Sequence, residues 1–215
     1  MTPALQSHAM LALCRSSPVI PVLVIESVDE AAPLALALRE GGLPVLEVTL
    51  RTPAALDAIS AMARVPGVRV GAGTVLSAHD AARAKAAGAD FAVAPGATPG
   101  LIAASVAQEL PLMPGAATAS EVMTLQERGY SMLKFFPAEA AGGTRMLSAL
   151  TGPLPRVRFC PTGGIAAEGA PDYLRLRNVV CVGGSWIAPP QMVAARDWQG
   201  ITALARAAAS LSRSS

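Results

Sequence analysis

Apolar residues recur along this chain as short runs, each followed by a turn that contains Gly or Pro and then by an alanine-rich stretch. The unit repeats with a period of roughly 20 to 28 residues, the pattern expected of alternating strands and helices. Near-continuous apolar runs are typical of parallel strands that are buried on both faces. The runs that predict strands are Val19–Ile25, Val45–Leu50, Val68–Gly71, Phe91–Ala94, Leu112–Met113, Met132–Phe135, Val157–Cys160 and Val179–Val182.

Helix-start signals follow several of these runs. Ser27–Glu30 and Thr118–Glu121 fit the capping box, in which a Ser or Thr side chain and a later Glu satisfy free backbone N–H groups. Thr52-Pro53 and Thr98-Pro99 each place a capping residue ahead of a first-turn proline. These signals predict a helix after each of the corresponding strands.

Eight strand–helix units in 215 residues predict a single α/β domain, a (β/α)8 TIM barrel. We expect an additional N-terminal helix in residues 1–17, the barrel core in residues 18–189 and a C-terminal helical segment in residues 190–215. The alternative is a doubly wound open sheet, which usually has a Gly-x-Gly-x-x-Gly turn after its first strand. Here Glu26–Val28 follows the first run and contains no glycine.

The composition narrows the class of protein further. The chain is 52% hydrophobic, but no uninterrupted apolar stretch reaches about 18 residues, so we expect no membrane span. No basic segment precedes an apolar run at the N-terminus, and we therefore expect a cytoplasmic protein. The formal net charge is +2 and the arginines are dispersed, which argues against nucleic acid as the main partner.

The cysteines and histidines do not suggest a metal site. Cys14, Cys160 and Cys181 lack metal-ligand spacing, and His8 and His79 are remote in sequence from the last two cysteines. We therefore expect no bound metal. We interpret Cys160 and Cys181 as small buried hydrophobic residues, with reactive thiols as the alternative.

Lys134 is the leading candidate for a catalytic residue. The chain has 17 Lys and Arg residues, of which only Lys85 and Lys134 are lysines. Lys85 has the surroundings of an exposed helix, whereas Lys134 lies where a buried strand runs into a turn. Burial disfavours the ammonium form, and a neutral amine attacks a carbonyl to form a Schiff base. The structural alternative is a lysine that extends from a strand end to solvent.

A second strand places polar side chains on one face. Glu47, Thr49 and Arg51 alternate with Val48 and Leu50, so the polar residues should face the barrel axis and its mouth. Barrel enzymes have their chemistry at the C-terminal ends of the strands. A buried carboxylate needs a partner or a function, and the structural alternative is an ion pair between Glu47 and Arg51.

Glycine-rich turns follow three of the predicted strands. Gly71–Thr74 allows close backbone approach, and Thr74 adds a hydroxyl. Pro161–Ile165 and Gly183–Ser185 follow the last two strands, where barrels commonly bind phosphate through backbone N–H groups. The structural alternative is a set of tight turns that need glycine because φ is positive.

Taken together, the motifs resemble the 2-keto-3-deoxy-6-phosphogluconate (KDPG) aldolase family, in the family's order and over about Val19 to Pro189. The resemblance implies a class I aldolase of the Entner–Doudoroff pathway, usually a homotrimer of barrels, that needs no metal or other cofactor. The segment Pro114–Thr118 departs mildly from the family pattern, which leaves fine substrate preference open. The motifs are Glu47–Thr52, Gly71–Val75, Lys134–Glu139, Phe159–Ile165 and Gly183–Trp186.

The resemblance also implies roles for individual residues. Lys134 would form the Schiff base and Glu47 would transfer protons. Arg51 and Thr74 would hold the carboxylate end of pyruvate. The other expected site residues are Pro95 and Phe136, which would line the site, and Thr162, Gly163, Gly164, Gly184 and Ser185, which would bind phosphate.

Several alternative activities stay open at this point. A 6-phosphogalactonate aldolase differs at the C4 stereocentre, although Leu50–Thr52 and Thr162–Gly164 favour the gluconate enzyme. A side activity on 4-hydroxy-2-oxoglutarate, which has no phosphate, fits the same chemistry. More distant alternatives are a phosphate-binding barrel isomerase or synthase without a Schiff base, and a catalytically silent sensor of sugar phosphates.

Overall fold

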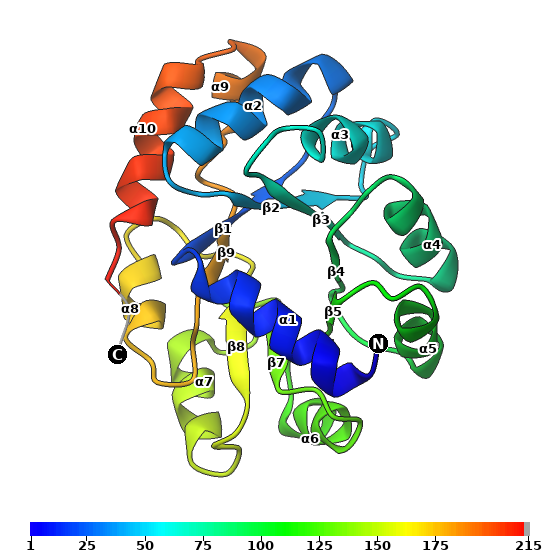
Figure 1. The fold of residues 1–215 in the computed structure, drawn as a ribbon. Coiled ribbons are helices and arrows are strands. Elements are labelled where there is room, and N and C mark those ends of the chain that lie inside the picture. The colour runs from blue at the N-terminus through cyan, green and yellow to red at the C-terminus, as the bar shows by residue number, and fades with distance from the viewer. Residues whose placement is uncertain (213–215) are drawn as a thin grey trace.

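The computed structural model describes residues 1–212 as an α/β fold in which parallel strands lie at the centre and helices surround them (Figure 1). The strands are β1 (Val19–Leu23), β2 (Val45–Thr49), β3 (Arg69–Gly73), β4 (Phe91–Val93), β5 (Leu112–Met113), β6 (Gly115–Ala116), β7 (Met132–Phe135), β8 (Arg158–Pro161) and β9 (Val182–Gly184). The helices are α1 (Pro3–Arg15), α2 (Val28–Glu40), α3 (Ala55–Met62), α4 (Ala78–Ala86), α5 (Pro99–Ala107), α6 (Ala119–Glu127), α7 (Gly143–Thr151), α8 (Ala170–Leu174), α9 (Pro190–Ala194) and α10 (Trp198–Ala209).

The strands form two parallel sheets, in the orders β5-β4-β3-β2-β1-β9 and β6-β7-β8. In the first sheet, Glu47 of β2 lies between Val22 of β1 and Gly71 of β3. In the second sheet, Lys134 of β7 is paired with Cys160 of β8. The alternation of buried strands and helices confirms the predicted α/β class.

The two sheets approach each other at both ends. Pro114 separates β5 from β6, and it cannot donate to a ladder because proline has no N–H. Its carbonyl instead accepts a hydrogen bond from the Lys134 N–H at 2.9 Å. For this reason the structure has two short strands where the sequence predicted one. On the other side, isolated bridges connect the β8 and β9 regions at Phe159–Val179 and Thr162–Gly183.

The last strand differs from the sequence-based expectation. It covers Val182–Gly184, whereas the apolar run predicted Val179–Val182. The strand includes Gly183, where the neighbouring Thr162 leaves no room for a side chain. A Cβ added at Gly183 would lie 2.3 Å from Oγ1 of Thr162.

Two of the four predicted helix starts are wrong in detail. Thr118 and Thr98 cap α6 and α5 with their side chains, as predicted. Ser27 precedes α2, but its side chain makes no capping hydrogen bond. The hydroxyl of Thr52 donates to the carbonyl of Ile25 at 2.5 Å instead of capping a helix, and α3 begins further along the chain.

Two apolar clusters lie on opposite sides of the strands. The larger cluster joins strand residues such as Leu46 and Val48 to the surrounding helices. The smaller cluster includes Val45 and Phe91 from the strands and reaches residues of α1. Gly71 makes room for this packing, because a Cβ added there would lie 2.2 Å from the Phe91 ring. The alternation along β2 therefore places Glu47 on the side of the smaller cluster.

Helix α1 crosses the end at which the strands begin (Figure 1). Its residue Gln6 accepts a hydrogen bond from the Tyr130 hydroxyl at 2.6 Å, and Ser7 accepts one from the Ser131 N–H at 2.9 Å. The C-terminal ends of the strands lie opposite α1. Of the predicted C-terminal helical segment, residues 213–215 lie outside the described part. Within residues 1–212, no helix combines the length and apolar character needed to cross a membrane.

Candidate active site

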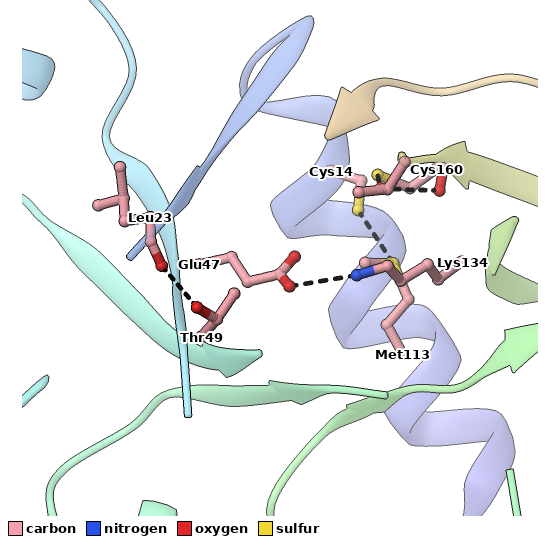
Figure 2. Close-up of polar contacts among 8 residues, drawn as sticks. Cys14, Leu23, Glu47, Thr49, Met113, Lys134 and Cys160 are labelled. Atoms are coloured by element: carbon pink, nitrogen blue, oxygen red, sulfur yellow. Dashed lines mark hydrogen bonds and ion pairs between the residues drawn. The ribbon is translucent and has the colours of Figure 1, made fainter. Parts of the chain in front are cut away.

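Lys134 and Glu47 point toward each other from β7 and β2 (Figure 2). Nζ of Lys134 lies 3.2 Å from Oε1 of Glu47, and the two residues are 5% and 2% exposed. Lys134 therefore does not extend to solvent. Its Nζ also lies 5.1 Å from the centroid of the Phe136 ring. An amine in direct contact with a buried carboxylate is placed to exchange a proton with it.

The partner of Glu47 differs from the structural alternative that the sequence left open. Within residues 1–212, the ion pair of Glu47 is formed with Lys134 and not with Arg51. Thr49, the next polar residue of β2, is buried and donates to the carbonyl of Leu23 at 2.9 Å. Its role in the described structure is to join β2 to β1.

Gly73 leaves the space that the Glu47 carboxylate occupies. A Cβ added at Gly73 would lie 2.3 Å from Oε1 and 2.7 Å from Cγ of Glu47. The sequence indicated only that the glycines of Gly71–Thr74 allow close backbone approach, and did not identify this role. The signal was present as a glycine at a strand end, but only the pairing of β2 with β3 identifies the side chain that fills the space.

A cavity of about 230 Å³ opens beside Lys134 at the C-terminal ends of five strands. It brings together seven of the predicted site residues. Four further lining residues were not predicted, and three of these, Val22, Val24 and Ile165, look like ordinary core residues in the sequence. A larger surface groove of about 430 Å³ between α2 and α10 contains none of the predicted residues. The lining of the cavity beside Lys134 is Val22, Val24, Arg51, Lys134, Phe136, Thr162, Gly163, Gly164, Ile165, Gly183 and Ser185.

Thr74 and Pro95 follow β3 and β4 at the same end of the strands, but neither is among the residues that line this cavity. Thr74 has a φ of 58°, which is in the left-handed region that β-branched residues rarely adopt. Strained backbone of this kind is often found at functional sites. The backbone of Pro95 packs directly against Gly115, because a Cβ added at Gly115 would lie 2.2 Å from the Pro95 carbonyl oxygen.

The glycines after β8 and at the end of β9 are required for different reasons. Gly163 and Gly164 have φ values of 106° and 80°, so the turn needs glycine for its backbone conformation. Gly184 does not share this conformation. A Cβ added at Gly184 would instead lie 2.1 Å from the Trp186 ring, so this position needs glycine because the indole occupies the space.

The three cysteines lie on the α1 side of the ion pair, and Figure 2 shows Cys14 and Cys160 there. All three are buried, which confirms the interpretation of Cys160 and Cys181 as core residues. Hydrogen bonds to Cys14 and Cys160, together with burial, raise the pKa of Cys181 well above its usual value, so this thiol stays protonated. Within residues 1–212, no group of His, Cys, Asp and Glu is arranged to hold a metal ion.

Comparison with known proteins identifies the family. The family model described as KDPG and KHG aldolase matches residues 10–204. The KHG/KDPG aldolase of Escherichia coli strain K12 is 50% identical over 194 residues, which cover 90% of this chain and 91% of the relative. The crystal structure of the KDPG aldolase of Zymomonas mobilis ZM4 with 3-phosphoglycerate is 48% identical, with a TM-score of 0.91 over 97% of this chain and 98% of that chain.

A second crystal structure bears on the chemistry of the family. The KDPG aldolase of Legionella pneumophila, with pyruvate captured as a covalent carbinolamine intermediate, is 48% identical to this chain. Its TM-score is 0.90, over 93% of this chain and 98% of that chain. The chain therefore belongs to the KDPG and KHG aldolase family of carbon–carbon lyases.

Proposed function

We propose that the protein is a class I aldolase that cleaves 2-keto-3-deoxy-6-phosphogluconate to pyruvate and glyceraldehyde 3-phosphate. The observation that carries the proposal is the buried 3.2 Å contact between Lys134 and Glu47 beside the cavity. A class I aldolase needs an amine nucleophile and an adjacent proton-transfer group, and this contact supplies both. The covalent carbinolamine that pyruvate forms in the Legionella pneumophila relative supports the same chemistry.

The reaction begins at Lys134. Its amine attacks the C2 ketone of the substrate, and Glu47 accepts the proton that leaves the nitrogen. Glu47 returns this proton to the C2 hydroxyl of the resulting carbinolamine, which leaves as water, so that an iminium ion forms and Glu47 is again a carboxylate. The positively charged nitrogen then withdraws electrons from the C3–C4 bond, so the mechanism requires no metal or other cofactor.

Cleavage depends on Glu47. Its carboxylate removes the proton of the C4 hydroxyl, through a bridging water, and the C3–C4 bond breaks. Glyceraldehyde 3-phosphate leaves, and the electron pair remains on the substrate fragment as an enamine. The enamine is protonated at C3, and hydrolysis releases pyruvate and restores the Lys134 amine.

The remaining residues are proposed to hold the two ends of the substrate. Arg51 and Thr74 bind the carboxylate of the pyruvate part, with Pro95 and Phe136 beside it. The charged side chains that line the cavity are Arg51 and Lys134, so phosphate binding must rest mainly on backbone N–H groups. The residues proposed for the phosphate are Gly163, Gly164, Gly184 and Ser185 through their N–H groups, and Thr162 and Ser185 through their hydroxyls.

We also propose that the two sheets close into one eight-stranded (β/α)8 barrel, in which β5 and β6 are two parts of one strand. The bridges between the β8 and β9 regions support this closure. The whole chain would then be one domain, with its N-terminal helix in residues 1–17, its core in 18–189 and its C-terminal segment in 190–215. Membership of the family supports a homotrimer that acts in the cytoplasm in the Entner–Doudoroff pathway.

A second substrate is 4-hydroxy-2-oxoglutarate, because the Escherichia coli relative is named for both KHG and KDPG. The same Schiff base would serve both substrates. An alternative substrate is the 6-phosphogalactonate analogue, which differs in the configuration at C4. The distant alternative is a phosphate-binding barrel isomerase or synthase that forms no iminium.

Borohydride trapping with pyruvate separates these possibilities. We expect an irreversible gain of mass that peptide mass spectrometry assigns to Lys134. A coupled assay of pyruvate release should then show faster cleavage of the phosphogluconate-derived substrate than of the phosphogalactonate-derived one. Absence of an adduct would contradict the Schiff-base mechanism, whereas equal rates would contradict only the preference at C4.

A further inference from the structure

Glu139 and Tyr173 contact each other behind the glycine turn that follows β8. Tyr173 belongs to α8, is buried, and donates a hydrogen bond to Oε1 of Glu139 at 2.5 Å. Glu139 lies in the connection between β7, which carries Lys134, and α7. The contact therefore joins the segments that follow two neighbouring strands of the site.

The connection that carries Glu139 also touches the turn directly. The N–H of Ala138 donates to the carbonyl of Thr162 at 2.8 Å, and the N–H of Glu139 donates to the carbonyl of Gly163 at 3.1 Å. A Cβ added at Gly164 would lie 2.9 Å from both Cβ and Cγ of Glu139. The methylene stem of Glu139 thus packs against Gly164, while its carboxylate is held by the Tyr173 hydroxyl.

The charges at this contact argue for a positioning role. A carboxylate repels phosphate, so Glu139 is unsuited to bind the anion itself. Burial, and then the hydrogen bond to Glu139, raise the pKa of Tyr173, so its hydroxyl stays protonated and able to donate at neutral pH. Gly143 leaves the room for this hydroxyl, because a Cβ there would lie 3.1 Å from it.

We propose that Glu139 and Tyr173 position the turn at residues 162–164 and thereby set the preference for phosphorylated over non-phosphorylated substrates. The inference rests on the proposed function, because it takes this turn as part of the phosphate site. Backbone N–H donors bind an anion well only when their directions are held in advance. Glycine has no side chain that could pack and fix the backbone of the turn, so a neighbouring segment must hold the turn in place.

The test compares two substrates that differ only in the phosphate, 2-keto-3-deoxy-6-phosphogluconate and 2-keto-3-deoxygluconate. Tyr173→Phe should raise KM for the phosphorylated substrate by about tenfold, the effect of losing a hydrogen bond to a charged group. The borohydride-trapped pyruvate adduct should form at the native rate. The ratio of kcat/KM between the two substrates should fall accordingly.

Position 139 adds a rescue experiment. Glu139→Ala removes both the methylene stem and the acceptor, and should lower the substrate ratio at least as much as Tyr173→Phe. Glu139→Gln keeps the stem and an oxygen acceptor, so it should restore most of the affinity for the phosphorylated substrate. If Glu139→Gln behaved like Glu139→Ala, the charge and not the contact would matter, and the positioning role would be wrong.

Tyr130→Phe is the matched control, since Tyr130 is also buried and its hydroxyl donates to Gln6 at 2.6 Å at the α1 end of the fold. It should lower thermal stability and leave the substrate ratio unchanged. The inference is overturned if Tyr173→Phe leaves the ratio unchanged, or if Tyr130→Phe lowers it equally. Failure of the unmodified protein to cleave the phosphorylated substrate would instead contradict the proposed function.

Discussion

The two halves of the candidate active site are built in different ways. One half consists of Lys134 and Glu47, two buried side chains on strands whose functional atoms lie 3.2 Å apart. The other half consists of the turn at residues 162–164 and the end of β9 with Ser185, where glycines leave the backbone close to the cavity. Covalent chemistry needs particular atoms at fixed positions, which strands provide. Recognition of an anion needs several N–H groups that converge, which turns provide.

This difference predicts two kinds of failure. A change in the Lys134 half should remove or slow the reaction for every substrate. A change in the glycine half should weaken the binding of phosphorylated substrates and leave the lysine reactive. The substitutions below test this division, beginning with the largest expected effect.

Lys134→Met should abolish both turnover and the trapped pyruvate adduct, because the nucleophile is absent. It also leaves the buried carboxylate of Glu47 without its partner, which should lower the free energy of unfolding by about 3–5 kcal/mol. Adding Glu47→Gln should recover part of that stability but none of the activity. Circular dichroism checks the fold, and turnover near the native level in the single variant would contradict the Schiff-base proposal.

Glu47→Gln should lower turnover by about 10²- to 10⁴-fold, the usual cost of removing a general base. The pyruvate adduct should be retained to a greater extent than turnover, since Lys134 remains in place. Single-turnover kinetics and borohydride trapping measure the two quantities separately. Native values for both would mean that Glu47 has only a structural role.

Gly73→Ala tests whether the position of Glu47 matters as much as its presence. The added methyl group would lie 2.3 Å from Oε1 of Glu47 and must displace the carboxylate. A misplacement of about 1 Å at a reacting group costs on the order of 10²-fold in turnover. Gly100→Ala is the matched control, because a Cβ there meets no atom within 4 Å, and its turnover should be native.

Gly184→Val tests the glycine half. The added side chain collides with the Trp186 ring, which lies 2.1 Å from the position of a Cβ, so the end of β9 or the indole must shift. We expect KM for the phosphorylated substrate to rise by about tenfold, the cost of one charged hydrogen bond, with the pyruvate adduct at Lys134 unaffected. An unchanged KM in a correctly folded variant would remove Gly184 from the proposed phosphate site.

Thr118→Ala lies outside both halves and should affect stability alone. It removes the capping box of α6 and should cost about 1 kcal/mol, measured by urea unfolding, with native kcat and KM.

The pKa of Glu121 in the same capping box is lowered from 4.5, mainly by a hydrogen bond from the Ala117 N–H and to a smaller extent by hydrogen bonds from Thr118. A lowered pKa in the folded state means that Glu121 stabilises the fold above its unfolded pKa and loses this contribution as the pH falls. The loss of folding free energy in Glu121→Gln, relative to the unmodified protein, should therefore become smaller below about pH 4.

Much of this protein was determined by local features of its sequence. The apolar runs and turn signals predicted the α/β class, because burial on both faces imposes a pattern that each strand carries by itself. Period-two alternation placed Glu47 on the inner side of β2, and the setting of Lys134 at a buried strand end made it the candidate nucleophile. Thr98 and Thr118 were correct as helix caps because the hydrogen bonds of a cap involve residues close in sequence.

Tertiary structure decided which residues meet. Glu47 pairs with Lys134, 87 positions away, and not with the nearby Arg51, because strand order and not sequence distance selects its partner. The roles of Gly73 and Gly184 likewise depend on side chains that only folding brings beside them. Glu139 ends one of the family motifs, but nothing in the sequence identifies Tyr173 as its partner. Local interactions shape each strand and turn, but the space between elements is defined only when all of them pack together.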